Sequence, residues 1–377
     1  MTKIRPEIEE AIDTLNLNGA TRRRLLSGAG LASAGLAASA LLSGCANASS
    51  GGGKGGVGDF PSTPKWRFVF VNHVTTNPFF QPTQYGMQDA CALLNCTTQW
   101  TGSKESVVPE MVNALNTAVS GKADGIAVSV VDTKAFKDPV NKALQAGIPV
   151  VSYNADGAVG NPGSSRLAYV GQDLFVSGQE VGKKLASLMS SASDVVGFIA
   201  TPGSLNIQPR IDGAKDALQK SGKMKSFKAV ATGAETPHEI TTIDAYVQSH
   251  GDVKAFFSVD GGSTEGLGDA MTKHKLKSKG VVAGGFDLEP KTLSAIKAGN
   301  LDFTVDQQPY LQGFLPVLYL YLYKLSGGLV APPETNTGLK FVTKDTVDPY
   351  ESTKTRYEGT SEKQKYVKTS GPIAHAS

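Results

Sequence analysis

Aromatic, amide and charged residues stand where several predicted strands end. The turn at residues 77–80 (Asn-Pro-Phe-Phe) follows an apolar strand, Arg210 opens a helix after another, and Asp260 and Asp287 close two more. Aromatic faces suit apolar C–H surfaces, and an amide both donates and accepts hydrogen bonds. A guanidinium donates to two neighbouring hydroxyl groups, and carboxylates accept from them. Because open parallel sheets bind ligands at the carboxyl ends of their strands, these residues predict a site for a small ligand rich in hydroxyl groups.

Each of these residues also has an ordinary structural interpretation. Phe79 and Phe80 could belong to the core, and Arg210 could be solvated in the first turn of its helix. Asp260 and Asp287 could cap the helices that follow them. The sequence leaves these alternatives open.

Motifs of the common hydrolases and metal sites are missing from the sequence. His238-Glu-Ile-Thr-Thr242 begins like a zinc-protease helix but has no second histidine, and no Gly-x-Ser-x-Gly occurs. The single Gly-x-Gly-x-x-Gly, at residues 51–56, has no strand before it. The five histidines show no metal-ligand spacing with the cysteines. We therefore expect no enzymatic activity, no metal and no cofactor.

Length and composition describe an ordinary globular protein. A chain of 377 residues exceeds what one hydrophobic core usually holds, which favours two lobes. Hydrophobic residues make up 40% of the chain and charged residues 19%, with a formal net charge of +3. So small a charge predicts no nucleic-acid partner.

Short apolar strands alternate with amphipathic helices along most of the chain. Such alternation is typical of parallel sheets covered by helices on both faces. It predicts an α/β fold with two doubly wound lobes. The first series has strands at 67–72, 97–100, 125–129 and 148–153 and helices at 82–94, 107–120 and 134–146. The second has strands at 195–199, 227–231, 255–258 and 281–284 and helices at 176–189, 210–221, 241–249, 263–274 and 290–298.

Three later segments, 303–305, 311–325 and 341–343, are too short for a third domain and are expected to complete the two lobes. The helix 311–325 is the most apolar of the chain. Gln312, Pro316 and Lys324 interrupt it, so we expect a buried helix and not a membrane span.

The N-terminus carries two export signals. Thr21-Arg-Arg-Arg-Leu-Leu26 leads into the apolar stretch 29–42, as in a twin-arginine signal peptide. Leu42-Ser-Gly-Cys45 then matches a lipobox, which predicts cleavage before Cys45 and lipidation of that cysteine. Residues 46–64 are rich in Ala, Ser and Gly and are expected to form a flexible tether.

Two further cysteines, Cys91 and Cys96, lie five residues apart. Outside the cytoplasm thiols tend to oxidise, so a local disulfide between them is one expectation. Two buried free thiols are the other.

Over residues 65–345 the pattern resembles the periplasmic sugar-binding proteins of the ribose-binding type. The motifs that carry the resemblance are Asn-Pro-Phe-Phe at 77–80, the arginine at 210 and Gly-Phe-Asp at 285–287. The family implies two α/β lobes joined by three hinge strands, the type I periplasmic binding protein fold. It implies an N-terminal lobe of 65–169 plus 308–338, a C-terminal lobe of 170–307 plus 339–350, and a tail of 351–377. The hinges would lie near 170–172, 306–307 and 339–341.

The resemblance also assigns substrate-binding roles residue by residue. It implies that one set of side chains lines the sugar site: Asn77, Phe79, Phe80, Asn154, Asp156, Arg210, Asp260, Asp287 and Gln307. Asp260 stands where the family usually has asparagine, and Gln307 where it has a hinge glutamine, with Asp306 as an adjacent alternative.

Departures from the family pattern concern the choice of sugar. Asn154-Ala155 stands where the family commonly has Asp-Arg, and the aromatic residue of the second lobe has no clear match in Glu235-Thr-Pro-His238. His238 could take its place or cap a surface helix; Trp100 could line the cleft or pack between the lobes. Without that arginine ribose is disfavoured, and a small polyol or another monosaccharide is expected.

The resemblance therefore implies an extracytoplasmic solute-binding protein of an ABC importer. We expect a monomer, lipid-anchored at the outer face of the cytoplasmic membrane, that captures a small carbohydrate and presents it to a permease complex. A surface receptor feeding a sensor kinase or chemoreceptor is the alternative. A sugar-responsive transcription regulator would need a basic helix-turn-helix at the N-terminus, where this chain has an export leader.

Overall fold

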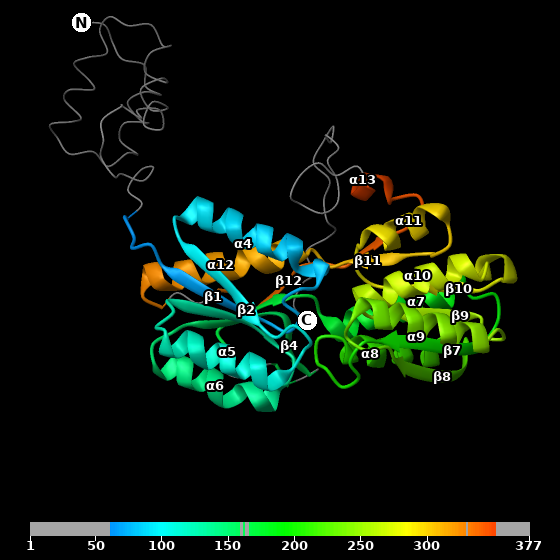
Figure 1. The fold of residues 1–377 in the computed structure, drawn as a ribbon, viewed down its shortest axis with the longest axis horizontal. Helices are drawn as coiled ribbons and strands as arrows, with labels where there is room; N and C mark the ends of the chain where they lie inside the picture. The colour runs from blue at the N-terminus through cyan, green and yellow to red at the C-terminus, as the bar shows by residue number, and fades with distance from the viewer. Residues whose placement is uncertain (1–60, 159–160, 163–165, 329–330, 352–377) are drawn as a thin grey trace, which may run out of the picture. The chain divides into compact units, whose positions relative to one another are not determined.

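The computed structural model describes residues 61–158, 161–162, 166–328 and 331–351 (Figure 1). The chain divides after Thr63, and every element below belongs to the unit that begins at Pro64. The predicted export signal, the lipidation site Cys45, most of the tether and most of the tail lie outside the described residues.

The first sheet follows the strand order β12-β6-β4-β3-β1-β2 and is parallel along this path. Its two faces are covered by α4 (Gln81–Leu94) with α12 (Pro309–Ser326), and by α5 (Val108–Ser120) with α6 (Thr133–Gln145) (Figure 1). Its strands are β1 (Arg67–Asn72), β2 (Thr97–Gly102), β3 (Gly125–Val130), β4 (Val150–Ala158), β6 (Tyr169–Gly171) and β12 (Glu334–Asn336), and β5 (Asn161–Pro162) pairs antiparallel with β4.

Alternating side chains of β1 supply the cores on both faces of this sheet. Val69 and Val71 belong to the apolar cluster that contains residues of α5 and α6. Phe68 and Phe70 belong to the cluster that contains residues of α4 and α12. A strand buried on both faces is continuously apolar, which is why this strand could be predicted from the sequence.

The second sheet is parallel in the order β10-β9-β7-β8. Helices α7 (Leu174–Leu188) and α8 (Gln208–Lys220) pack on one face, and α9 (Thr236–Ser249), α10 (Gly261–Lys273) and α11 (Pro290–Ala298) on the other. The strands are β7 (Ser193–Ile199), β8 (Met224–Ala231), β9 (Ala255–Ser258) and β10 (Val282–Gly284). Short elements complete the fold: the 3-10 turns η2 (Pro78–Phe80) and η3 (Leu276–Lys279), the antiparallel pair β11 (Thr304–Asp306) and β13 (Lys340–Val342), and α13 (Asp348–Glu351).

The chain passes between the two halves three times: after β6, after β11, and between β12 and β13. Hydrogen bonds join these crossing segments. The Gln172 side-chain amide donates to the Gly338 carbonyl at 3.0 Å, and the Thr337 hydroxyl donates to the Gln307 carbonyl at 2.7 Å. The predicted fold class, two doubly wound parallel-sheet lobes joined by three crossing segments, is confirmed; the residue boundaries of the lobes stay a prediction.

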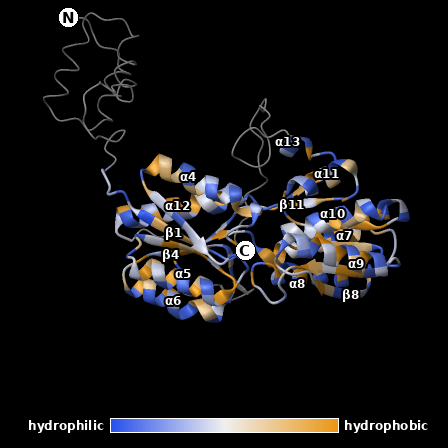
Figure 2. Cartoon of the chain, in the orientation of Figure 1, coloured by the Kyte–Doolittle hydropathy of each residue, from blue (hydrophilic) through white to orange (hydrophobic). Residues whose placement is uncertain are grey.

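Apolar residues gather toward the sheets and polar residues toward the outer helix faces (Figure 2). Helix α12 follows this rule, because Val317 and Leu320 are fully buried beside Phe68 and Phe70. Among the described residues, no helix is both long enough and apolar enough to cross a membrane.

Helix α9 begins at Thr236, five residues before the predicted start at 241. Pro237 occupies its first turn, a position where the missing N–H and fixed φ of proline suit a helix start. Glu239 therefore lies in the first helical turn and not in a loop.

Candidate ligand-binding site

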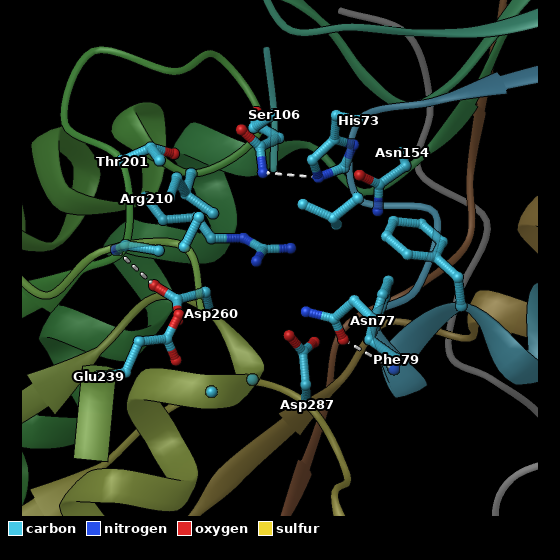
Figure 3. A pocket seen from close by; sticks show the side chains of 18 of the residues that line it. His73, Asn77, Phe79, Ser106, Asn154, Thr201, Arg210, Glu239, Asp260 and Asp287 are labelled. Carbon is cyan, nitrogen blue, oxygen red and sulfur yellow. Dashed lines mark hydrogen bonds between the residues drawn. The ribbon is translucent and has the colours of Figure 1, made fainter. Parts of the chain in front are cut away.

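A cavity lies where the carboxyl ends of strands from both sheets face each other (Figure 3). It holds about 560 Å³ of space free of protein atoms, part of it open to solvent. Eight of the nine residues predicted to bind the ligand line this cavity: Asn77, Phe79, Phe80, Asn154, Arg210, Asp260, Asp287 and Gln307.

On the side of the first sheet, the turn after β1 presents an amide and an aromatic ring. The Asn77 Oδ1 accepts a hydrogen bond from the Phe79 backbone N–H at 2.9 Å and so caps η2. Figure 3 shows its NH₂ group pointing into the cavity. The Phe79 and Phe80 rings meet edge to face at 4.7 Å, and Phe80 is buried against His73. Phe80 therefore lines the cavity as a core residue, and Phe79 is the more accessible ring.

Asn154 adopts a left-handed backbone conformation in β4, with φ of 64°. Its Nδ2 donates to the Gln312 Oε1 of α12 at 3.0 Å, which orients the side chain at the cavity wall. A positive φ is uncommon for a residue with a side chain and is often found at functional sites.

Asp156 is the predicted residue that the structure does not bring to the cavity. Its carboxylate forms a paired interaction with Arg166, at 2.6 Å from Nη2 and 3.1 Å from Nε, and also accepts from the Ser152 hydroxyl. The structure thus gives Asp156 an ion pair within the protein, outside the residues that line the cavity, and its ligand-binding role stays a prediction. The ion pair was not evident from the sequence, since Arg166 lies ten residues further along the chain.

Arg210 is held in the cavity wall by three hydrogen bonds. Its Nη1 donates to the Val259 carbonyl at 2.9 Å, and its Nη2 donates to Gln307 Oε1 at 2.9 Å and Gln172 Oε1 at 3.2 Å. The guanidinium also stacks over the Phe286 ring at 4.2 Å. Its buried Nε has no hydrogen-bond partner in the described structure, so this donor is available to a ligand or a water molecule.

Close packing of α7 on α8 places the backbone of Arg210. A Cβ at Gly178 would lie 2.2 Å from the Arg210 carbonyl oxygen, too close for any side chain. The glycine thus lets α8 approach α7 until the guanidinium reaches the cavity. In the alternative that the sequence left open, Arg210 would be solvated, but it is only 3% exposed.

Asp287 continues this hydrogen-bonded series. Its Oδ1 accepts from Gln307 Nε2 at 2.5 Å, which links Arg210, Gln307 and Asp287 in one chain of donors and acceptors. Burial raises the pKa of Asp287 to about 6, against the opposing effect of Arg210. Asp287 does not cap α11, whose N-cap residue is Glu289.

Asp260 lines the cavity but uses both carboxylate oxygens within the protein. Oδ1 accepts from the Ser263 N–H at the start of α10, and Oδ2 accepts from the Ala200 N–H after β7, each at 2.9 Å. The structure therefore gives this residue the helix-capping role that the sequence left open.

Two polar residues of the wall, His73 and Asn206, were missed in the sequence. Asn206 Nδ2 and His73 Nε2 are 3.0 Å apart, while His73 Nδ1 lies 3.0 Å from the Ser129 hydroxyl. Burial, with a smaller effect of Arg210, lowers the pKa of His73 to about 3, so the ring is neutral and accepts from Asn206. The signal was available, because His73 directly follows β1, at the same sheet edge as Asn77.

Neither His238 nor Trp100 is among the residues that line this cavity. The His238 ring lies 2.6 Å from the Thr232 carbonyl oxygen. Trp100 donates to the Thr75 carbonyl at 3.0 Å and packs behind Phe80. Cys91 and Cys96 are free thiols whose sulfur atoms lie 2.9 Å apart, and their disulfide stays a prediction.

The chain belongs to the periplasmic binding protein domain family, whose model matches residues 68–327. It is 45% identical over 400 residues to the xylose/arabinose-binding protein XylF of Sulfolobus acidocaldarius, and the match covers 98% of each chain. It is 24% identical over 242 residues to the ribose import binding protein RbsB of Haemophilus influenzae, covering 64% of this chain and 80% of the relative. The family predicted from the cleft motifs is confirmed.

Solved structures of this fold include sugar complexes. A solute-binding protein of an ABC transporter from Burkholderia graminis, in complex with D-arabinose, matches with a TM-score of 0.70 at 23% identity, over 77% of this chain and 99% of that one. GanP, a glucose-galactose binding protein from Geobacillus stearothermophilus, matches with a TM-score of 0.69 at 23% identity, over 76% of this chain and 100% of that one. At this level of identity the likeness shows the fold, the type I periplasmic binding protein.

Proposed function

We propose that this protein is the extracytoplasmic solute-binding component of an ABC importer and that it captures an aldopentose, xylose or arabinose. The observation that carries the proposal is the chain of hydrogen bonds from Arg210 through Gln307 to Asp287 in the wall of a cleft between two lobes. The relative from Sulfolobus acidocaldarius, similar over nearly the whole of both chains, supports a pentose. Of the two ligand classes expected from the sequence, the monosaccharide is therefore preferred to the polyol.

The side chains of the cleft match the surface of a monosaccharide. Arg210 contributes a donor and Asp287 an acceptor for neighbouring hydroxyl groups, and each is fixed through Gln307 before the ligand arrives. Phe79 offers an apolar face to the C–H groups of the ring, and Asn77 offers an amide. Groups that are already ordered lose little conformational entropy on binding, which favours affinity.

We further propose that the lobes, bounded as the sequence predicts, close on the ligand about the three crossing segments. Arg210 supports this mechanism, because it donates to Gln172 on the first crossing segment and to Gln307 on the second. A ligand that engages Arg210 thus acts directly on the hinge. Small-angle scattering should show a smaller radius of gyration with saturating sugar, and an unchanged radius would contradict closure.

For cellular location we propose export as a monomer and lipid anchoring through Cys45, followed by delivery of the sugar to a permease. The support is the sequence from Thr21 to Cys45. Replacing Cys45 with Ser should release the protein from the membrane fraction, and retention there would contradict the anchor. The alternative partner, a sensor kinase or chemoreceptor, stays a prediction that neighbouring genes would test.

Titration calorimetry with D-xylose, L-arabinose, D-ribose, xylitol and arabitol tests the ligand class. We expect micromolar or tighter binding of at least one of the first two sugars. Binding only of the sugar alcohols, or of none of the five, would contradict the proposal.

A further inference from the structure

Glu239 is a buried acidic residue of the cavity wall that the site described above does not use. It lies in the first turn of α9, is 3% exposed, and lines the cavity beside Asp260 (Figure 3). Its Oε2 has no hydrogen-bond partner in the described structure. A buried polar atom without a partner is destabilising, so its presence requires an explanation.

The start of α10 is shaped around this side chain. A Cβ at Gly262 would lie 1.7 Å from the Glu239 Oε2, and a Cβ at Gly261 would lie 2.0 Å from the Glu289 Oε1. Both glycines line the cavity. A larger residue at position 262 would displace the Glu239 carboxyl group, so the helix start provides a fitted space for it.

Burial and the neighbouring acidic groups determine the protonation state of Glu239. Burial, with smaller effects of repulsion from Asp260, Glu289 and Glu265, raises its pKa to about 10. Glu239 is therefore a neutral carboxylic acid at neutral pH and carries one O–H donor. Because the buried Glu239 Oε2 has no hydrogen-bond partner in the described structure, that donor remains for a group in the cavity.

We propose that Glu239 contacts the ligand and determines specificity, by donating a hydrogen bond to one oxygen of the bound pentose from the α9–α10 side of the cleft. This inference rests on the proposed function. The aromatic residue that the family has in the second lobe has no clear match in Glu235-Thr-Pro-His238, and the residue that follows, Glu239, lines the cavity. A polar wall selects for an oxygen at the facing ring position, and a site built to hydrogen-bond a hydroxyl group rejects the analogue that lacks it.

The test compares Glu239→Gln and Glu239→Leu with the wild type by titration calorimetry. The ligand is D-xylose or L-arabinose, whichever the wild type binds more tightly, together with its 2-, 3- and 4-deoxy derivatives. Glutamine keeps a donor and an acceptor, so affinity should stay within about threefold, whereas leucine should weaken binding at least tenfold. Asp244→Leu is the matched control, because Asp244 lies on the same helix α9, pairs with Lys273 and does not line the cavity.

The deoxy sugars separate a ligand contact from a structural effect. If Glu239 contacts one hydroxyl group, the deoxy sugar that lacks this group binds the wild type more weakly than the parent sugar does. The same deoxy sugar binds Glu239→Leu no more weakly than the parent sugar does. A damaged cleft would not produce this coupling. Equal losses for all the sugars, or unchanged binding by Glu239→Leu, would overturn the inference while the proposed function stands. A wild type that binds neither pentose would overturn the proposed function and the inference with it. Thermal unfolding without ligand verifies that each variant is folded.

Discussion

Replacement of Asp287 by Ala should weaken pentose binding more than any other single change at the cleft. Asp287 is 5% exposed; its Oδ1 accepts from Gln307 Nε2 at 2.5 Å, and Gln307 Oε1 accepts from Arg210 at 2.9 Å. The variant therefore loses an acceptor for the ligand and also frees the amide that orients the guanidinium.

The size of the effect follows from these contacts. A hydrogen bond to a charged group contributes about 1.5–3 kcal/mol, and a buried donor left unpaired costs about 1–3 kcal/mol. Since the loosened Gln307 can turn to a water molecule, we expect a total near 3 kcal/mol, or roughly a 100-fold rise in Kd. Asp287→Asn keeps an acceptor for Gln307 and should cost only about tenfold, because it loses the charge alone.

Titration calorimetry of the purified variants measures this difference. Asp212→Ala is the matched control, because Asp212 is an exposed aspartate on α8, two residues after Arg210, whose carboxylate accepts from the Gln208 side chain and which does not line the cavity. Its Kd should stay within about threefold of the wild type. Should Asp287→Ala bind the sugar as the wild type does, the assignment of Arg210, Gln307 and Asp287 to the ligand would be refuted.

Two further predictions concern stability. Arg166→Ala should lower the free energy of unfolding by about 3 kcal/mol, because it leaves the Asp156 carboxylate buried without its cation. The Kd for the sugar should change less than threefold. Urea unfolding measures the first effect and calorimetry the second, and a large loss of affinity would indicate that Asp156 contributes to ligand binding. Because the pKa of Glu239 is raised to about 10 in the folded state, the native protein keeps a proton that the unfolded chain releases near pH 4.5, so this group lowers stability as pH rises between these values. Its contribution reaches about 1.4 kcal/mol per pH unit, and Glu239→Gln should flatten the dependence of the urea midpoint between pH 5 and 9; parallel dependences in the two proteins would contradict the assignment.

The elements that form the sheets could be predicted from the sequence because local signals agree with the fold. The four central residues of β1, at 68–71, are all apolar, since the strand is buried on both faces. Its carboxyl end is followed by Asn77 and Phe79, and the rule for open sheets then places both at the ligand cleft. The start of α9 was placed too late, since the signal of Pro237 was not used.

The remaining differences depend on contacts between distant parts of the chain. Asp156 was predicted to bind the ligand because it follows the strand predicted at 148–153, and only the folded chain brings Arg166 onto it. Glu239 was not predicted from the sequence, because it is a candidate only through the space that Gly262 leaves for its carboxyl group. No local sequence pattern predicts that a glycine packs on a carboxyl group. Sequence reasoning thus located the sheet edge, while the partners of each polar side chain required three-dimensional structure.

Titration of the purified protein with D-xylose and L-arabinose tests the central claim most directly. We predict saturable binding of one molecule per chain with micromolar or lower Kd for at least one of these sugars, weakened roughly 100-fold in Asp287→Ala. The absence of any heat with both sugars, from a protein that unfolds cooperatively, would contradict the account.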